Sequence, residues 1–203
     1  MPGAVPARDA VGSGTDAGNP PPVRLPGARR PDRGLPVTAG PVVRDVLLRP
    51  GDFHFGGAGT RIRTLLGSCV SITMWHPQRQ IGGMCHFVVP TRRLGVADDL
   101  DGRYADEAVA LFLLEIARHR TCPEQYVVKM FGGGSQFPLH PGSGLPHVPS
   151  DNIAAGLSLL AAHGFTLSSR HLGGTGARSL AFDITSGDVW LKHVDRPSPG
   201  DLA

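Results

Sequence analysis

The 203-residue chain has no run of roughly 18 apolar residues, so the sequence predicts no membrane-spanning helix. Its beginning also lacks the apolar stretch of a secretory signal. Cysteine is scarce: Cys69, Cys85 and Cys122 are odd in number, and none belongs to a CxxC pair. This pattern excludes a disulfide framework and a zinc knuckle. We therefore expect a cytoplasmic protein with free thiols.

Aromatic residues are absent from residues 1–40, which contain 7 Gly and 8 Pro. Such a segment buries too little apolar surface to offset a backbone entropy cost of about 1–2 kcal/mol per residue. We therefore expect a disordered Pro/Gly-rich arm over residues 1–40, one domain over 41–195 and a flexible tail over 196–203. The net charge of the whole chain is only +3, and the arm supplies much of it. A basic face for nucleic acid is not supported.

Alternating and continuous apolar patterns predict strands in the first half of the domain. Val70, Ile72 and Met74 alternate with polar or interfacial residues, so one face of this strand is buried. The turn at residues 76–80 makes Ile81–Val89 its hairpin partner, ending at Pro90. Earlier strands are predicted at Val46–Leu48 and Ile62–Leu66.

The second half alternates helices with strands. Apolar residues at helical spacing predict an amphipathic helix over Tyr104–His119. A second helix is expected to follow a loop at 138–149, with an N-cap among Ser150–Asn152 and a stop at Gly164. The remaining expected strands are Tyr126–Phe131, Phe165–His171, Leu180–Ile184 and Val189–Val194. These elements define an α/β or α+β domain.

The segment Gly67-Ser68-Cys69 breaks the apolar pattern between two strands. A thiol at such a turn is a candidate nucleophile, with the adjacent backbone amides as an oxyanion hole. The alternative is a small buried cysteine at the start of a strand. The hairpin would bring His86 beside this turn as a candidate base. Cys85 must then face the opposite side of the strand, because successive residues alternate.

Other candidate sites are weaker. His140 and His147 lie in a Gly/Pro-rich loop and have no third metal ligand at a suitable spacing. Gly132–Gly134 lacks the Lys-Ser/Thr pair of a phosphate-binding loop. The sequence therefore predicts neither a metal nor a cofactor.

Several segments, in their order along the chain, resemble the chemoreceptor glutamine deamidases of the CheD family. They are Thr64–Val70 (TLLGSCV), Gly82–Pro90 (GGMCHFVVP), Arg103–Asp106, Lys129–Gly133, Leu172–Gly174 and Ala177–Ser179. The resemblance extends over roughly residues 45–194.

The resemblance implies a layered sandwich of mixed β-sheet with flanking helices, similar to toxin-type cysteine deamidases. It implies hydrolysis of glutamine side chains on methyl-accepting chemotaxis receptors, releasing ammonia through a thioester. Cys69 would be the nucleophile, His86 the general base and acid, and Thr64 the third catalytic residue. Backbone amides at Gly67, Ser68 and Cys69 would hold the oxyanion, and the Gly132–Gly134 and Gly173–Gly174 turns would border the cleft.

Three alternatives stay open. The same acyl-enzyme chemistry would cleave a glutamate methyl ester. The resemblance also allows a non-catalytic role as the partner of a CheC-type phosphatase. A thiol hydrolase with a small-molecule amide substrate is the third possibility.

Overall fold

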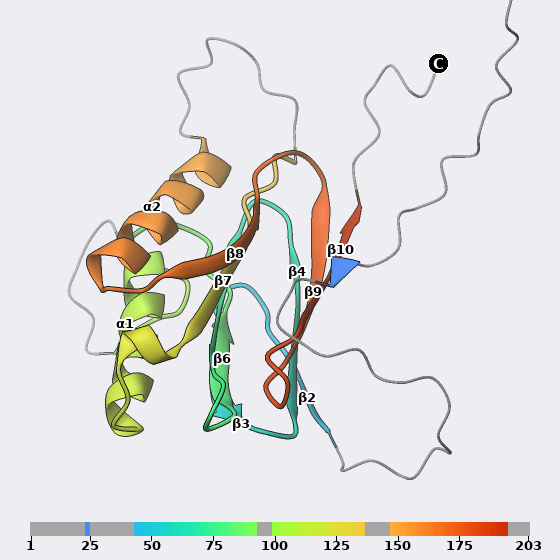
Figure 1. Cartoon of the computed structure of the whole chain (residues 1–203). Helices are drawn as coiled ribbons and strands as arrows, with labels where there is room; N and C mark the ends of the chain where they lie inside the picture. Colours follow the sequence, from blue (N-terminus) through green and yellow to red (C-terminus); the bar gives the residue numbers. More distant parts are fainter. Residues whose placement is uncertain (1–22, 25–42, 93–98, 137–146, 195–203) are drawn as a thin grey trace, which may run out of the picture.

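The computed structural model describes residues 23–24, 43–92, 99–136 and 147–194. These form two five-stranded β-sheets and two α-helices, arranged in layers (Figure 1). The predicted arm and tail therefore lie almost entirely outside the described residues. Within the described part of the chain, no helix is long and apolar enough to cross a membrane.

The inner sheet has the strand order β3-β6-β5-β7-β8, and the outer sheet has the order β1-β10-β9-β4-β2. The inner strands are β3 (Phe53–Gly57), β5 (Val70–His76), β6 (Ile81–Cys85), β7 (Val127–Gly132) and β8 (Leu167–Leu172). The outer strands are β1 (Val23–Arg24), β2 (Arg44–Leu47), β4 (Thr60–Leu66), β9 (Ala177–Asp183) and β10 (Val189–Val194). Both sheets are mixed, because β2 pairs with β4 in parallel and β7 pairs with β8 in parallel.

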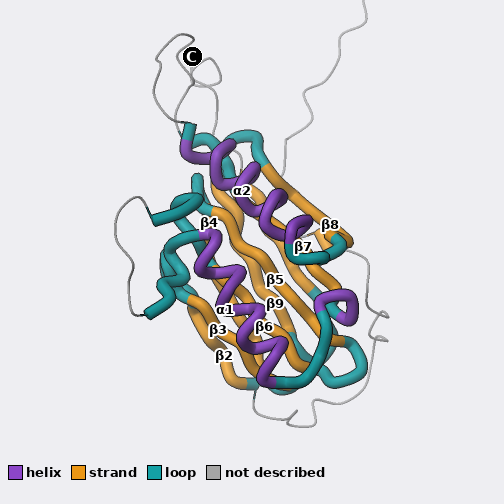
Figure 2. The backbone as a smooth tube through the Cα atoms, turned by 90° about the vertical axis from the view of Figure 1, so that its left-hand side faces the viewer, coloured by secondary structure: helices purple, strands orange, loops and turns teal. Residues whose placement is uncertain are grey.

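Helices α1 (Ala105–Arg118) and α2 (Val148–Ala162) cover one face of the inner sheet, and the outer sheet lies on its other side (Figures 1 and 2). The inner sheet therefore separates two apolar cores. Val70, Ile72 and Met74 of β5 belong to the core under the helices. Met84 of β6 and Phe131 of β7 belong to the core between the sheets. The layered sandwich of mixed sheet with flanking helices is confirmed.

Most predicted elements are confirmed, with small differences at their ends. The helix predicted at Tyr104–His119 is α1, with these two residues as its caps. The predicted hairpin is β5–β6, whose antiparallel register pairs Thr73 with Met84. The strand predicted at Val189–Val194 is β10.

Two predictions of element boundaries are wrong, and one strand was missed. The strand expected to run from Ile81 to Val89 ends at Cys85, because the His86 backbone bonds to the preceding turn: its N–H donates to Asp52 and its carbonyl accepts from Gly51. Strand β3 was not predicted, since its sequence FHFGG shows no clear alternation. Helix α2 begins at Val148, inside the expected loop, with His147 rather than Ser150–Asn152 as its N-cap. Proline is accommodated here because the first turn of a helix does not use its N–H.

Candidate functional site

Thr64 and His86 are joined across the two sheets. The Thr64 hydroxyl lies 2.8 Å from Nδ1 of His86 and donates to the Leu48 carbonyl at 3.0 Å. A threonine hydroxyl has a single hydrogen, so it must accept from His86. His86 is thereby held with its proton on Nδ1, which leaves Nε2 as a hydrogen-bond acceptor.

Cys69 and His86 lie on the same side of the inner sheet. Beyond the regular ladder of β5 and β6, Val70 and Phe87 exchange backbone hydrogen bonds of 3.1 and 2.9 Å. This pairing continues the hairpin register, so Cys69 and His86 both point toward the outer sheet. Cys69 packs at the border of the core between the sheets, whereas Cys85 is buried under the helices. The prediction that Cys85 and His86 face opposite sides is confirmed.

Burial differs sharply within this group. His86 is 1% exposed and Thr64 is 2% exposed, whereas Gly67, Ser68 and Cys69 are partly exposed. Nε2 of His86 is buried and has no hydrogen-bond partner among the described residues. The site therefore has a turn that reaches the surface and, behind it, a histidine with an available acceptor nitrogen.

Burial also determines the electrostatics. It lowers the pKa of His86 to about 4, against a smaller opposing effect of the Asp52 carboxylate. Burial raises the pKa of the Cys69 thiol, although hydrogen bonds from the Ser68 hydroxyl and from its own N–H act in the opposite direction. Both shifts favour the uncharged forms of the imidazole and the thiol.

The carbonyl groups of the Gly67–Cys69 turn are all tied to other segments. Gly67 accepts from the Gly134 N–H at 2.9 Å, and Cys69 accepts from the Gly133 N–H at 2.8 Å. Ser68 accepts from Nδ2 of Asn152 at 3.4 Å. A trans peptide places its N–H opposite its carbonyl, so the N–H groups of Ser68 and Cys69 point away from these partners.

Glycines allow these close contacts. Gly132 has a φ of +116°, and a Cβ there would lie 2.2 Å from the Cys69 carbonyl oxygen. A Cβ on Gly67 would lie 3.1 Å from the side chain of Gln136, whose amide donates to the carbonyls of Gly134 and Gly176. The second predicted glycine turn also reaches this region, because the Gly173 N–H donates to the Gly132 carbonyl.

Sequence reasoning did not identify Asn152 or Gln136 as parts of this site. Asn152 was expected among the N-cap residues of the second helix and was not assigned to this site. It shares the spacing i, i+4, i+8 with Gly156 and Leu160, and all three are buried. A polar residue in an otherwise apolar helical stripe was the available signal, because buried polar groups require partners. The sequence around Gln136 gave no comparable signal.

Other predicted candidates are not part of the arrangement. His147 caps α2, and its Nδ1 lies 2.8 Å from the Ser150 hydroxyl. His140 lies outside the described residues. In the described ranges, no cluster of three His, Cys, Asp or Glu side chains could hold a metal ion.

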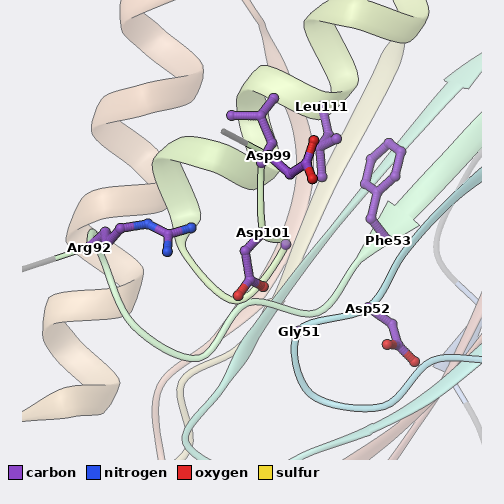
Figure 3. Close-up of a pocket in the computed structure, with 9 residues that line it drawn as sticks. Gly51, Asp52, Phe53, Arg92, Asp99, Asp101 and Leu111 are labelled. Atoms are coloured by element: carbon purple, nitrogen blue, oxygen red, sulfur yellow. The ribbon is translucent and has the colours of Figure 1, made fainter. Parts of the chain in front are cut away.

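A cavity of about 740 Å³ lies between the turn before β3 and the segment that leads into α1 (Figure 3). Asp52, Arg92 and Asp101 are among its lining residues, and none of the five predicted site residues is. The Arg92 guanidinium makes paired hydrogen bonds of 2.8 and 2.9 Å to the Glu107 carboxylate. This cavity is therefore separate from the Cys69 turn.

The family model described as "CheD chemotactic sensory transduction" matches residues 89–193. A relative from Dechloromonas aromatica (strain RCB), named "Probable chemoreceptor glutamine deamidase CheD 3", is 48% identical over 149 residues, which are 73% of this chain and 87% of that protein. A relative from Pseudomonas savastanoi pv. phaseolicola, named "Probable chemoreceptor glutamine deamidase CheD", is 47% identical over 154 residues, or 74% and 85% of the two chains. The chain belongs to the CheD family.

Among solved structures, the Bacillus licheniformis hypothetical protein YfiH aligns with 69% of this chain and 60% of its own at a TM-score of 0.38 and 9% identity.

Proposed function

We propose that this protein is a protein-glutamine deamidase that converts specific glutamines of methyl-accepting chemotaxis receptors to glutamate. One observation carries the proposal: the Thr64 hydroxyl holds His86 as the tautomer whose Nε2 accepts protons, on the face that also bears Cys69. The names of the related proteins supply the substrate class.

The first half of the reaction forms a thioester. The proton of the Cys69 thiol passes to Nε2 of His86, and Sγ attacks the carboxamide carbon of the glutamine. The carbonyl oxygen takes the negative charge, and the N–H groups of Ser68 and Cys69 are oriented to receive it. The carbon–nitrogen bond then breaks, and His86 returns the proton to the nitrogen, so that ammonia leaves.

The second half restores the enzyme. His86 takes a proton from water, and the resulting hydroxide attacks the thioester carbon. The carbon–sulfur bond breaks, Cys69 recovers its proton from His86, and glutamate is released. Thr64 keeps the ring orientation and tautomer constant throughout, since its own hydrogen is committed to the Leu48 carbonyl.

Partial exposure of the turn suits a macromolecular substrate. Gly67, Ser68 and Cys69 are accessible from the surface, whereas His86 is not. A glutamine side chain projecting from a receptor helix would reach Cys69 without opening either apolar core. A glutamate methyl ester would fit the same chemistry, because it forms the same thioester.

The test is mass spectrometry of a purified receptor cytoplasmic fragment after incubation with the protein or with Cys69→Ala. We expect the mass gain of glutamine-to-glutamate conversion with the intact protein alone. Equal gain with Cys69→Ala would refute the assignment of the nucleophile. Absence of gain with both would favour the regulatory pairing with a CheC-type phosphatase that the family resemblance allows.

A further inference from the structure

Asn152 connects two segments that carry the candidate nucleophile and base, one just before β5 and one just after β6. Its Nδ2 donates to the Val88 carbonyl at 2.7 Å and to the Ser68 carbonyl at 3.4 Å. Val88 follows His86 by two residues, and Ser68 immediately precedes Cys69. The Asn152 side chain thus bridges the hairpin where the backbone pairing of Val70 with Phe87 ends.

The orientation of this side chain is determined by its partners. Two carbonyl oxygens face one end of the amide, so that end must be the NH₂ group with its two hydrogens. Asn152 is fully buried, and its Oδ1 has no partner among the described residues. A buried acceptor without a hydrogen-bond partner lowers stability. An apolar side chain of the same size would therefore fill this space with a smaller loss of stability than the amide.

The close packing of α2 against the inner sheet brings Asn152 to this position. A Cβ on Gly156 would lie 2.4 Å from Cε of Met130, so the helix lies close against the inner sheet at this point. The buried face of α2 therefore reaches the ends of the strands one turn earlier, at Asn152.

We propose that Asn152 is a positioning residue that fixes the oxyanion-binding N–H of Cys69. The Ser68 carbonyl and the Cys69 N–H belong to the same peptide group, so a bond that holds one fixes the direction of the other. The hydrogen bonds of Asn152 go to backbone carbonyls and not to the thiol or the imidazole. It acts on the charge that develops on the substrate oxygen, and this inference rests on the acyl-transfer chemistry proposed above.

The experiment compares two reactions of Cys69 in the full chain. Acylation by p-nitrophenyl acetate passes through an oxyanion, whereas alkylation by iodoacetamide displaces iodide and does not. In Asn152→Ala we expect acylation and the kcat for deamidation to fall about 10- to 100-fold with KM little changed. Alkylation should stay within about threefold of the unmodified protein.

Two further variants separate positioning from folding. Asn152→Leu keeps about the volume of the side chain and removes both donors, so it should show the same divergence between acylation and alkylation. Leu160→Ala shortens a buried side chain of the same helix face and should lower thermal stability without separating the two reactions. All rates are measured well below each variant's unfolding temperature.

The outcomes are distinguishable from failure of the proposed function. Acylation that is unchanged in both Asn152 variants, or that falls in parallel with alkylation, would overturn the positioning role. Cys69-dependent acylation that is lost on Asn152 substitution, in a protein that never deamidates receptor glutamines, would support the positioning role and refute the substrate. If the unmodified protein shows neither acylation at Cys69 nor deamidation of the receptor fragment, both proposals are overturned.

Discussion

At the scale of single residues, burial is what tunes the candidate site. It lowers the pKa of His86 to about 4 and raises the pKa of the Cys69 thiol. Both effects favour the neutral forms, since burial penalises charge. In the proposed reaction, the proton of Cys69 would therefore pass to His86 during catalysis and not before it.

This order of proton transfer predicts the pH dependence of alkylation at Cys69. Without a resting ion pair, the rate of iodoacetamide alkylation should rise continuously through pH 9, because the thiolate fraction does. The measurement is the loss of free Cys69 by peptide mass spectrometry from pH 5 to 10. A plateau of fast alkylation near pH 6 that disappears in His86→Gln would show that an ion pair exists after all.

The lowered pKa of His86 also predicts a pH dependence of stability. Between about pH 4 and 6.5 the unfolded chain binds a proton at His86 that the folded chain does not. The free energy of unfolding should therefore decrease as the pH falls through this window. Urea titrations at pH 7 and pH 5 should show a smaller decrease in His86→Gln than in the unmodified protein, and an equal decrease would contradict the assigned cause.

Thr64 offers a direct test of how the imidazole is held. In Thr64→Val the shape of the side chain is kept but its hydrogen bond to Nδ1 of His86 is lost. We expect kcat for deamidation to fall about tenfold, since a free ring can occupy the unproductive tautomer. The matched control is Thr60→Val, a buried threonine on the same face of β4. If both substitutions reduce kcat equally, the effect belongs to the strand and not to the hydrogen bond.

At the scale of elements, the turn after β7 supports the turn that carries Cys69. Gly132 and Gly133 both have positive φ angles, and the Gly133 N–H bonds to the Cys69 carbonyl. A side chain on Gly132 would collide with that same carbonyl. The two turns can pack this closely only because the last residue of β7 lacks a Cβ.

We therefore expect Gly132→Ala to displace the Cys69 turn and to abolish deamidation, with a loss of more than about 1 kcal/mol in stability. Gly164→Ala is the control, because Gly164 also has a positive φ of +77° but its Cβ would approach nothing closer than 3.7 Å. It should lose about 1 kcal/mol and keep its activity. Activity assays and thermal unfolding of both variants distinguish the collision with the Cys69 carbonyl from the backbone strain that both variants share. A Gly132→Ala variant that keeps its activity would refute the role of the collision.

Local patterns were sufficient to predict most elements, and long-range pairings were not predictable from them. Apolar residues alternate along Val70–Met74, and they recur at helical spacing from Val109 to Ile116. Each pattern is contained in one segment of the sequence, so β5 and α1 could be predicted. Strand β3 has almost no such pattern. The contact of Thr64 with His86 depends on how two different sheets pack, which no local pattern encodes. It was expected only through resemblance to a family.

The same distinction explains which site residues escaped prediction. Cys69 and Ser68 interrupt an apolar pattern, so they were visible in the sequence. Asn152 lies 84 residues from Ser68 and 64 from Val88, and its role exists only because α2 packs over the strand ends. Long-range hydrogen bonds of this kind are determined by tertiary packing.

At the scale of the whole molecule, the described core residues come from one part of the chain. The described residues of both apolar cores fall between Leu48 and Leu191. Strand β1 pairs Val23 and Arg24 with Leu191 and Trp190 of β10. The catalytic arrangement proposed here, from Thr64 to Asn152, lies inside the same stretch.

We therefore expect a chain shortened to residues 43–194 to keep the fold and the chemistry. Its thermal midpoint should lie within about 3 °C of the full chain, because every described residue of the two cores is retained. Its kcat for deamidation should be unchanged, since each residue assigned to the reaction is retained.

A matched shorter chain that also loses β10, ending at Asp188, should fail to fold because Val189 and Leu191 belong to the core between the sheets. If the 43–194 chain keeps its midpoint and kcat but its KM for the receptor fragment rises, the removed segments contact the receptor. A drop in the midpoint would instead assign them to the fold and refute the prediction.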